Sequence, residues 1–337
     1  MGFTIICNVA FEVENDFFLL QLAIMKPQDL LEAAKSLRKK YAVTDGEPFR
    51  LKHCDPNETS GLPGIKKGDS KELLEESVQM MAELQDMLYA QDHWSILLIF
   101  QAMDAAGKDG VIKHVMSGIN PQGCEVHSFK APSTEELDHD FLWRSMRRLP
   151  ARGMIGIFNR SYYEEVLVVR VHPEILQSQK IPPELVGENI FEKRQADIRQ
   201  MEEFLGRNGT VVRKFFLNVS KKEQKKRFLE RIDTPEKNWK FSAADVKERQ
   251  YWDQYMNAYE SMIQATSSKE SPWHVIPADN KWYTRIAVSG IIIDTLASLN
   301  LHYPKVDEKR LAQLKEVRAT LMAETEEDQI CSVNPAT

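Results

Sequence analysis

Hydrophobic residues divide the chain into short apolar runs that alternate with longer amphipathic segments. The short runs are typical of buried strands in a parallel sheet. The longer segments repeat apolar residues every three or four positions, which is the spacing of a helix with one buried face. The runs predicted as strands are 95–101, 124–129, 153–158, 210–219 and 273–277. The segments predicted as helices are 30–40, 70–91, 134–148, 189–206, 282–296 and 307–323, with others that begin near 111 and 221.

Strands that alternate with helices predict an α/β fold of three layers, in which helices cover both faces of a parallel sheet. A ligand then binds at the carboxyl ends of the strands. We expect residues 25–300 to form a single domain that begins with a helical arm, and residues 301–337 to form a last helix and a tail. Residues 1–24 carry three acidic residues and lack the basic start of a signal peptide. They are interpreted as an N-terminal extension, because a sequence more typical of a globular protein begins at Met25.

The stretch 95–113, SILLIFQAMDAAGKDGVIK, joins a predicted strand to a predicted helix through a loop of small residues. This order is that of a phosphate-binding P-loop, in which a helix N-terminus offers unpaired N–H groups to an anion. Gly107 lets the backbone approach a phosphate, and Lys108 adds a positive charge. An ordinary strand-to-helix turn with a chance Gly-Lys pair is the alternative. The predicted phosphate-binding residues are Ala105, Ala106, Gly107, Asp109 and Gly110, beside Lys108.

The loop departs from the usual pattern G-x-x-x-x-G-K-[ST] at two positions. Ala102 stands where the first glycine is expected, and Asp109 stands in place of serine or threonine. Without that hydroxyl, a Mg2+ ion needs another oxygen ligand, and Asp104 inside the loop is the nearest hard oxygen. Asp104 is therefore the predicted metal ligand.

Positive charge is concentrated in the segment 221–240, which holds eight basic and four acidic residues in a chain of net charge −6. On a helix, Lys225 and Lys226 lie one turn after Lys221 and Lys222. The segment is either a solvated helix surface or the lid of a site for a polyanion.

Arg160, just after a predicted strand, is suited to binding a transferring phosphoryl group, although a structural salt bridge is the alternative.

Composition narrows the function classes. The hydrophobic content of 42% and the charged content of 28% are those of a globular protein. The four cysteines are widely spaced, which favours a reducing cytoplasm over a disulfide framework. No apolar run is long enough to cross a bilayer, and we expect neither a membrane nor nucleic acid as a partner. Neither a serine-hydrolase motif nor a histidine metal motif is present.

Several long motifs together resemble the polyphosphate kinase 2 family. They are QAMDAAGKDGVIKHVMSGINPQGCEVHSFKAPSTEELDHDFLW, GIFNRSYYEEVLVVRVHPE, ERIDTPEKNWKFSAADVKERQYWDQYMNAYESMI and PWHVIPADNKWY, in this order between about residues 45 and 300. Many family members carry Asp-Arg-Ser-Trp-Tyr-Asn-Arg where this chain has Asn-Arg-Ser-Tyr-Tyr-Glu-Glu at 159–165. The variant is similar to the subgroup, class III, that phosphorylates both AMP and ADP. It makes residue 159 a weaker metal ligand than aspartate.

The resemblance implies a thymidylate-kinase-like P-loop fold with a helical lid near 221–250. It implies reversible, Mg2+-dependent phosphoryl transfer between inorganic polyphosphate and AMP, ADP or ATP, with GMP and GDP as further acceptors, in a cytoplasmic homo-oligomer such as a dimer or tetramer. By the same resemblance, Asp104, Lys108 and Arg160 are catalytic. Polyphosphate or lid contacts are implied at Lys113, Arg231 and Lys240, and the predicted nucleotide contacts are Asn159, Tyr163, Glu164, Glu165 and Arg170. The basic helix face adds Lys225 and Lys226 as predicted polyphosphate contacts.

Two rival functions fit parts of the sequence. An ATP-dependent nucleotide kinase of the P-loop class leaves the long basic segment unexplained. A non-enzymatic polyanion-binding module leaves Asp104 and Lys108 without a task. A donor competition between ATP and polyphosphate separates the first rival from polyphosphate-dependent transfer, and salt-sensitive binding without turnover would favour the second.

Overall fold

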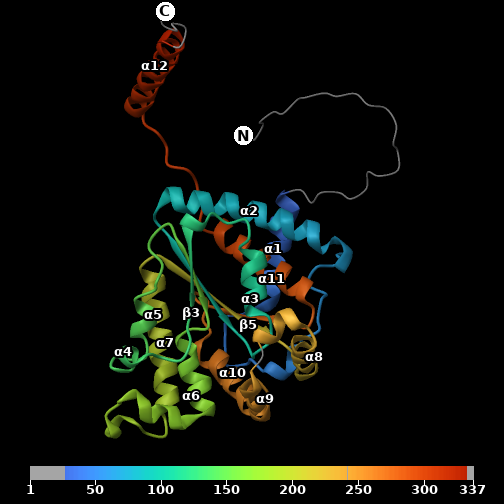
Figure 1. Cartoon of the computed structure of the whole chain (residues 1–337). Coiled ribbons are helices and arrows are strands. Elements are labelled where there is room, and N and C mark those ends of the chain that lie inside the picture. The colour runs from blue at the N-terminus through green and yellow to red at the C-terminus, as the bar shows by residue number, and fades with distance from the viewer. Residues whose placement is uncertain (1–26, 241, 332–337) are drawn as a thin grey trace, which may run out of the picture.

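The computed structural model describes residues 27–240 and 242–331, and a six-stranded sheet lies at its centre (Figure 1). The strand order is β1-β6-β5-β2-β4-β3. All neighbouring strands are parallel except β1, a two-residue strand that pairs antiparallel with β6 and that the hydrophobic pattern did not predict. The predicted α/β fold with a parallel sheet is confirmed. The strands are β1 Ala42–Val43, β2 Ser95–Gln101, β3 Cys124–Ser128, β4 Ile155–Asn159, β5 Thr210–Asn218 and β6 Trp273–Pro277.

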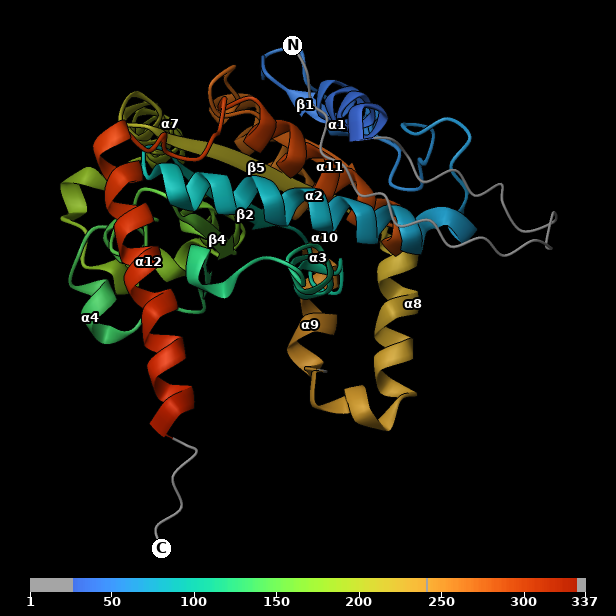
Figure 2. The same ribbon diagram turned by 90° about the horizontal axis from the view of Figure 1, so that it is seen from above.

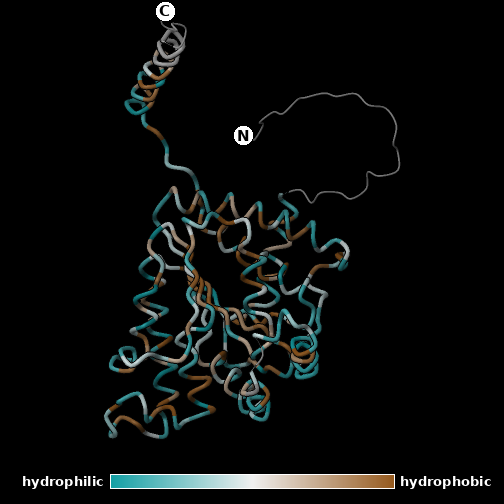
Figure 3. Tube along the Cα trace, in the orientation of Figure 1, coloured by the Kyte–Doolittle hydropathy of each residue, from teal (hydrophilic) through white to brown (hydrophobic). Residues whose placement is uncertain are grey.

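The central strand β2 is buried along its whole length. It pairs with β4 at one edge and with β5 at the other. Because successive side chains of a strand point to opposite faces, the burial of all seven residues shows that both faces are covered. Its apolar run therefore lacks the polar alternation of a strand with one wet face. At its start, the hydroxyls of Ser95 and Thr210 lie 2.9 Å apart and satisfy each other between β2 and β5. Figure 3 shows the hydrophobic residues concentrated along these central strands.

Helices α1, α2, α3 and α11 cover one face of the sheet, and α7 and α10 cover the other (Figures 1 and 2). Helix α11 is apolar almost all round because it packs between the sheet and both α1 and α2. Gly290 permits the close approach of α1, since a Cβ there would lie 2.8 Å from Leu37 Cδ1. The helices are α1 Pro27–Tyr41, α2 Ser70–Gln91, α3 Lys108–Val115, α4 Thr134–Leu137, α5 Trp143–Met146, α6 Val168–Val171, α7 Ile190–Arg207, α8 Lys221–Ile232, α9 Ala243–Glu248, α10 Trp252–Thr266, α11 Lys281–Ala297 and α12 Glu308–Cys331.

The prediction of one helix over 134–148 is wrong, because the structure has two short helices there, α4 and α5. A capping box of Ser133 and Glu136 starts α4. Asp140 then accepts hydrogen bonds from the backbone N–H groups of Leu142 and Trp143, which turns the chain and starts α5 afresh. Such local side-chain bonds to the backbone compete with a continuous helix.

The predicted helical lid corresponds to a hairpin of helices that projects from the body (Figure 2). It consists of α8, the 3-10 turn η7 (Pro235–Lys240) and α9. Ser220 caps α8 by accepting a hydrogen bond from the N–H of Glu223 at 3.1 Å.

Helix α12 extends away from the body, and its described side chains are exposed (Figure 1). A helix over 307–323 is present, as predicted, but it continues to Cys331 and its described side chains do not form the buried face that the apolar spacing predicted. The predicted extension of residues 1–24 lies outside the described residues. Within residues 27–240 and 242–331, no helix has both the length and the apolar content that crossing a membrane requires.

Candidate active site

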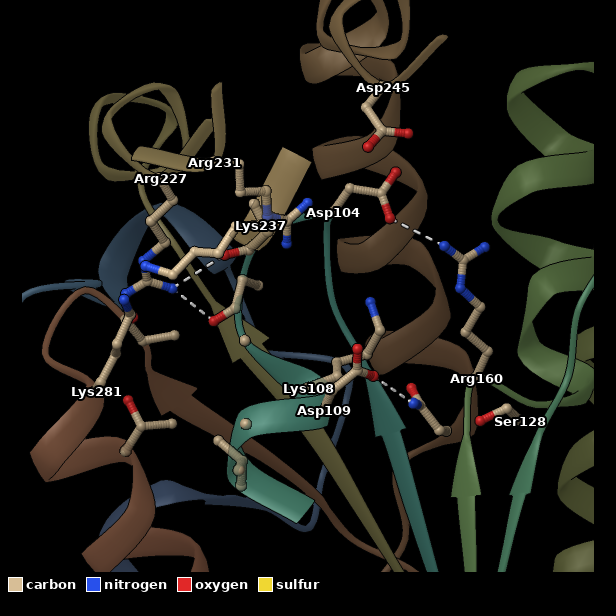
Figure 4. A pocket seen from close by; sticks show the side chains of 18 of the residues that line it. Asp104, Lys108, Asp109, Ser128, Arg160, Arg227, Arg231, Lys237, Asp245 and Lys281 are labelled. Carbon is tan, nitrogen blue, oxygen red and sulfur yellow. Dashed lines mark hydrogen bonds and ion pairs between the residues drawn. The ribbon is translucent and has the colours of Figure 1, made fainter. Parts of the chain in front are cut away.

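A cavity of about 800 Å³ lies where the predicted fold places a binding site, at the carboxyl ends of β2 and β4 and beneath the lid hairpin (Figure 4). Residues from the loop after β2, from β3 and β4, from the lid hairpin and from α11 line it. They are Asp104, Ala105, Ala106, Gly107, Lys108, Asp109, Gly110, Val111, Ser128, Phe129, Lys130, Ala131, Asn159, Arg160, Arg227, Glu230, Arg231, Lys237, Trp239, Asp245, Ala278, Lys281, Thr284 and Arg285.

The loop after β2 turns sharply into α3 at Gly107, whose φ of 108° is in the left-handed region that favours glycine. Ala105 also has a positive φ, 61°, which is strained for a residue with a Cβ. The first intrahelical bond of α3 joins the N–H of Val111 to the carbonyl of Gly107 at 2.9 Å. The N–H groups before it have no partner within the helix and form an anion-binding end that borders the cavity.

The guanidinium of Arg227, from the lid helix α8, holds this strained loop in place. It donates to the carbonyl of Ala106 at 2.6 Å and to that of Ala105 at 3.2 Å, and on its other side to the carbonyl of Ala278 at 2.6 Å. The Arg227 side chain is only 4% exposed. The lid hairpin is therefore anchored at its base to the loop after β2 and to the loop after β6.

Lys108 is the first residue of α3, and its ammonium donates to the carbonyl of Ala102 at 2.8 Å. Burial, together with the charge of Arg160, lowers the pKa of Lys108, while the carboxylates around it oppose this shift. A phosphate in the cavity would bring negative charge close to this buried ammonium and would favour its charged form.

Arg160 follows β4 and faces the loop after β2. Its guanidinium bonds to a carboxylate oxygen of Asp104 at 2.9 Å and lies 3.5 Å from Glu164. Burial lowers the pKa of Arg160, but the carboxylates of Glu164 and Asp104 outweigh this and raise the pKa overall. A smaller cavity of about 360 Å³ adjoins the first, shares Asp104 and Arg160 with it, and is also lined by Glu164.

A second carboxylate, Asp245 of α9, lines the cavity and lies above Asp104 in Figure 4. Burial, and then the negative charge of Asp104, raise the pKa of Asp245. A cation between the two would relieve this repulsion. The described residues contain no cluster of three or more metal-ligating side chains. Mg2+ is commonly held by one or two carboxylates with phosphate and water as its remaining ligands, so Asp104 and Asp245 fit a Mg2+ site.

Basic side chains form the wall of the cavity opposite Arg160. Arg231 and Lys237 come from the lid hairpin, and Lys281 comes from the start of α11 (Figure 4). Arg285 comes from the next turn of α11. On the side of Arg160, Lys130 adds a further basic side chain from the loop after β3, the strand that pairs with β4. The positive charge needed for an anion site is therefore local, as the net charge of −6 requires.

The structure brings most of the predicted site residues into the cavity and places others elsewhere. Asn159 lines the cavity, and its amide donates to Asp109 at 2.7 Å. Glu164 faces Arg160 and the smaller cavity. The predicted residues in the large cavity are Asp104, Ala105, Ala106, Gly107, Lys108, Asp109, Gly110, Asn159, Arg160 and Arg231.

The remaining predicted contacts do not line either of these two cavities. Tyr163 is fully buried, and Glu165 forms a buried ion pair with Arg194 at 2.9 Å. Arg170 bonds to Ser261 at 3.1 Å and to Glu192 at 3.3 Å. Lys113, Lys225 and Lys226 are exposed outside the cavity, and the side chain of Lys240 is outside the described part of the chain.

The cavity residues that were not among the predicted site residues include the charged residues Lys130, Lys237, Asp245, Lys281 and Arg285. Lys281 and Arg285 had a usable signal, because they lie at i and i+4 at the start of a helix that follows a buried strand. Side chains there face the carboxyl edge of the sheet. Asp245 had no such signal, since its place depends on how the lid hairpin folds back over the cavity.

Comparisons with known proteins agree with this geometry. The family model described as Polyphosphate kinase 2 (PPK2) matches residues 64–304. The chain is 58% identical over 252 residues to the ADP-polyphosphate phosphotransferase of Rhodopseudomonas palustris, and the aligned region covers 74% of this chain and 87% of that protein. It is 43% identical over 267 residues to the AMP/ADP-polyphosphate phosphotransferase of Meiothermus ruber, and the aligned region covers 79% of this chain and 96% of that protein.

A solved structure extends this similarity to the fold. The crystal structure of polyphosphate kinase 2 from Arthrobacter aurescens TC1 matches with a TM-score of 0.78 at 43% identity, over 85% of this chain and 98% of that chain. The family model alone matches more than half of the chain, in the region that contains the loop after β2, Arg160 and the lid hairpin. The chain belongs to the polyphosphate kinase 2 family.

Proposed function

We propose that this protein transfers the terminal phosphoryl group of inorganic polyphosphate to AMP and to ADP. The observation that carries the proposal is the arrangement of charge around the large cavity. The anion-binding end of α3 and Lys108 lie on one side, and Arg231, Lys237, Lys281 and Arg285 extend the positive charge beyond them. Such a row suits a long polyanion, because polyphosphate carries about one negative charge per phosphate along its length.

The transfer needs positioning and charge neutralisation rather than a protein nucleophile. A phosphate oxygen of the nucleotide attacks the terminal phosphorus of polyphosphate, and the bond from that phosphorus to its bridging oxygen breaks. The nucleotide gains one phosphate, and polyphosphate leaves one unit shorter with the electron pair on its new terminal oxygen. Lys108 and Arg160, which line the cavity together, are the groups that would meet the charge on the transferred phosphoryl group.

Arg160 is the proposed contact for the transferring phosphoryl group. Its guanidinium is planar and carries several donors, so it can bond to Asp104 and to a phosphoryl oxygen at the same time. We place the acceptor phosphates on the side of the cavity formed by Lys130, Asn159 and Arg160, and the donor on the side of the lid hairpin and α11. One of the two relatives described above is named for ADP, and the other is named for AMP and ADP. These names support the proposal that this protein uses both nucleotides as acceptors.

Mg2+ is the proposed cofactor, with Asp104 and Asp245 as its protein ligands. When bound, it would neutralise phosphate charge. The amide of Asn159 donates to Asp109 and so holds the start of α3 to the end of β4. Asn159 is therefore given a structural part in this scheme rather than a place among the metal ligands.

A donor competition tests the proposed function. The full-length protein would be incubated with AMP, Mg2+ and either polyphosphate or ATP, and the products would be separated by anion-exchange chromatography. We expect faster ADP formation from polyphosphate at equal concentrations of phosphoanhydride. Turnover with ATP alone would instead favour an ATP-dependent nucleotide kinase, and polyphosphate binding without turnover would favour a polyanion-binding module.

Asp104→Asn is expected to raise the Mg2+ concentration that gives half-maximal activity by about tenfold. One of two anionic oxygen ligands becomes neutral, while the shape of the side chain is kept. The measurement is a Mg2+ titration of initial rate at saturating polyphosphate and AMP. Asp92→Asn at the end of α2, outside the residues that line the cavity, is the matched control. A Mg2+ titration of Asp104→Asn that matches the parent would remove Asp104 from the metal site.

Arg231→Gln combined with Lys237→Gln is expected to raise the KM for long-chain polyphosphate by about tenfold or more. These two side chains line the cavity, and attraction between charges is largely screened beyond about 8–10 Å at ordinary salt. Lys225→Gln combined with Lys226→Gln removes the same charge from the same hairpin but from outside the cavity. Initial-rate kinetics should show a much smaller change for that control pair. Equal effects of the two pairs would mean that net charge, and not the cavity wall, attracts the donor.

Four parts of the sequence-based interpretation stay predictions. They are the reverse reaction, the use of GMP and GDP as acceptors, a cytoplasmic location, and a homo-oligomeric state such as a dimer or tetramer. The division into an extension of residues 1–24, a domain of residues 25–300 with its lid near 221–250, and a tail from 301 is likewise a proposal.

A further inference from the structure

The backbone at Arg160 is held in a conformation that a residue with a Cβ rarely adopts. Its φ is 64°, in the left-handed region, and its N–H donates across the sheet to the carbonyl of Phe100 at 3.1 Å. Such strain persists only when the surroundings fix it. The three residues that follow Arg160 in the chain, Ser161, Tyr162 and Tyr163, are all 0% exposed.

A buried charge network lies directly behind these residues. One carboxylate oxygen of Glu202, on α7, accepts hydrogen bonds from the hydroxyls of Tyr162 at 2.9 Å and Tyr163 at 2.7 Å. Its other oxygen pairs with the ammonium of Lys214, on β5, at 2.5 Å. Lys214 also donates to the carbonyl of Thr266, at the end of α10, at 2.7 Å. Both charged side chains are 0% exposed.

The network joins four elements at one point: the turn η4 (Tyr162–Val166) after Arg160, helix α7, strand β5 and the end of α10. The ring of Tyr163 also packs against Trp273 of β6, with their centroids 4.8 Å apart. Burial and the charge of Glu202 raise the pKa of Tyr162 and of Tyr163 well above the ordinary value. Both hydroxyls therefore stay protonated and keep donating to Glu202 at neutral pH.

A buried ion pair contributes little to stability by itself, because removing two charges from water costs about as much as their attraction returns. A role in positioning is a better reason for this one, since both tyrosines bonded to Glu202 follow Arg160 in the chain. We propose that Glu202, held by Lys214, is a positioning residue for Arg160. By fixing Tyr162 and Tyr163, it keeps Arg160 aimed at Asp104 and at the transferring phosphoryl group. This inference rests on the proposed function, which makes Arg160 a catalytic residue.

The test removes the two hydroxyls and keeps the ion pair. In Tyr162→Phe with Tyr163→Phe, the pair between Lys214 and one Glu202 oxygen is kept, but the other buried Glu202 oxygen loses both of its donors, so the melting temperature is expected to fall. In Tyr163→Phe alone, Tyr162 still donates to that oxygen. We expect kcat for AMP phosphorylation to fall about tenfold or more, because a small misplacement of a catalytic group can cost about 100-fold. The KM values for AMP and polyphosphate should change less than about twofold, since the binding surface of the cavity is intact. Tyr163→Phe alone provides a milder variant.

A double-mutant cycle with Arg160→Ala separates positioning from general destabilisation. If the tyrosines act through Arg160, the tenfold loss should disappear when Arg160 is already absent. Thr210→Val is the matched control, because it removes a buried hydroxyl bond to Ser95 at the opposite end of the strands. It should leave kcat unchanged. Circular dichroism melting curves would verify that each variant is folded.

The outcomes are distinct. A loss of kcat that depends on Arg160 supports the inference. A folded double tyrosine variant with parental kcat overturns it, and so does an equal loss in the presence and absence of Arg160. In both of these cases the parent protein is active, and the proposed function stands. A parent protein that transfers no phosphoryl group from polyphosphate overturns the proposed function and this inference together.

Discussion

Lys108→Met is expected to lower kcat by about 100- to 1000-fold, the usual cost of removing one donor that stabilises charge in a transition state. Methionine keeps most of the unbranched stem of the buried side chain but removes the ammonium, which donates to the carbonyl of Ala102 at 2.8 Å. Burial lowers the pKa of Lys108, and a phosphate beside the ammonium would oppose this shift, as the neighbouring carboxylates do. The effect should therefore fall mainly on the chemical step.

The measurement is steady-state kinetics of AMP phosphorylation by polyphosphate. Melting curves would establish that Lys108→Met is folded. Lys71→Met is a matched control, because that lysine on α2 is 89% exposed and outside the cavity. It should change kcat less than about twofold. A folded Lys108→Met protein that keeps parental turnover would remove the lysine from the mechanism.

Arg160→Ala is expected to lower kcat by about 100-fold or more, because two effects combine. The transferring phosphoryl group loses its guanidinium partner, and the carboxylates of Asp104 and Glu164 lose the cation that bonds to them at 2.9 and 3.5 Å. The unpaired carboxylates would then repel phosphate. Arg160→Lys should recover only part of the activity, since a point charge cannot replace the planar donor group that reaches both partners.

Kinetics for Arg160→Ala, Arg160→Lys and the parent would be measured with AMP and with ADP as acceptors. Arg199→Ala on α7 is the control, because that arginine forms an exposed pair with Glu203 four residues on. Such pairs contribute little. Full activity of Arg160→Lys would show that charge alone matters at this position. Full activity of Arg160→Ala would return Arg160 to the purely structural role that the sequence left open.

The loop after β2 could be predicted from the sequence because all the residues that identify it lie next to one another in the chain. A buried strand, small residues, Gly107 and Lys108 are consecutive in the chain, and a parallel sheet places such a loop at its carboxyl edge. Asp104 and Arg160 were also predictable, since each follows one of two adjacent strands. Their 2.9 Å contact follows from the pairing of β2 with β4.

The turn after Arg160 could not be resolved from sequence. Its positive φ and the 3-10 turn that follows direct Tyr163 and Glu165 into the interior, and only Glu164 returns toward Arg160. Periodicity has no information on a turn of this kind, because it assumes a regular helix or strand. The expected nucleotide contacts at Tyr163 and Glu165 are instead buried polar links to Glu202 and Arg194.

The face that α8 turns toward the cavity could not be predicted from the sequence, for a different reason. The sequence predicted α8, but not which of its basic residues face the cavity. Arg227 docks under the loop after β2, so residues one turn away, such as Arg231, face inward while Lys225 and Lys226 face solvent. Asp245 and Lys281 reach the cavity from elements more than 100 residues away from Asp104 in the chain, and no local pattern connects them.

The most direct measurement is a time course with AMP, Mg2+ and polyphosphate as the sole phosphoryl donor, resolved by anion-exchange chromatography or 31P NMR. Polyphosphate-dependent transfer to both acceptors predicts that ADP appears first and ATP follows as ADP accumulates, while polyphosphate shortens by one unit per transfer. The Lys108→Met protein should form neither product at a comparable rate. ADP that accumulates without any ATP would contradict the second acceptor. AMP that stays unconverted with polyphosphate, yet gives ADP when ATP is added, would contradict polyphosphate as the donor.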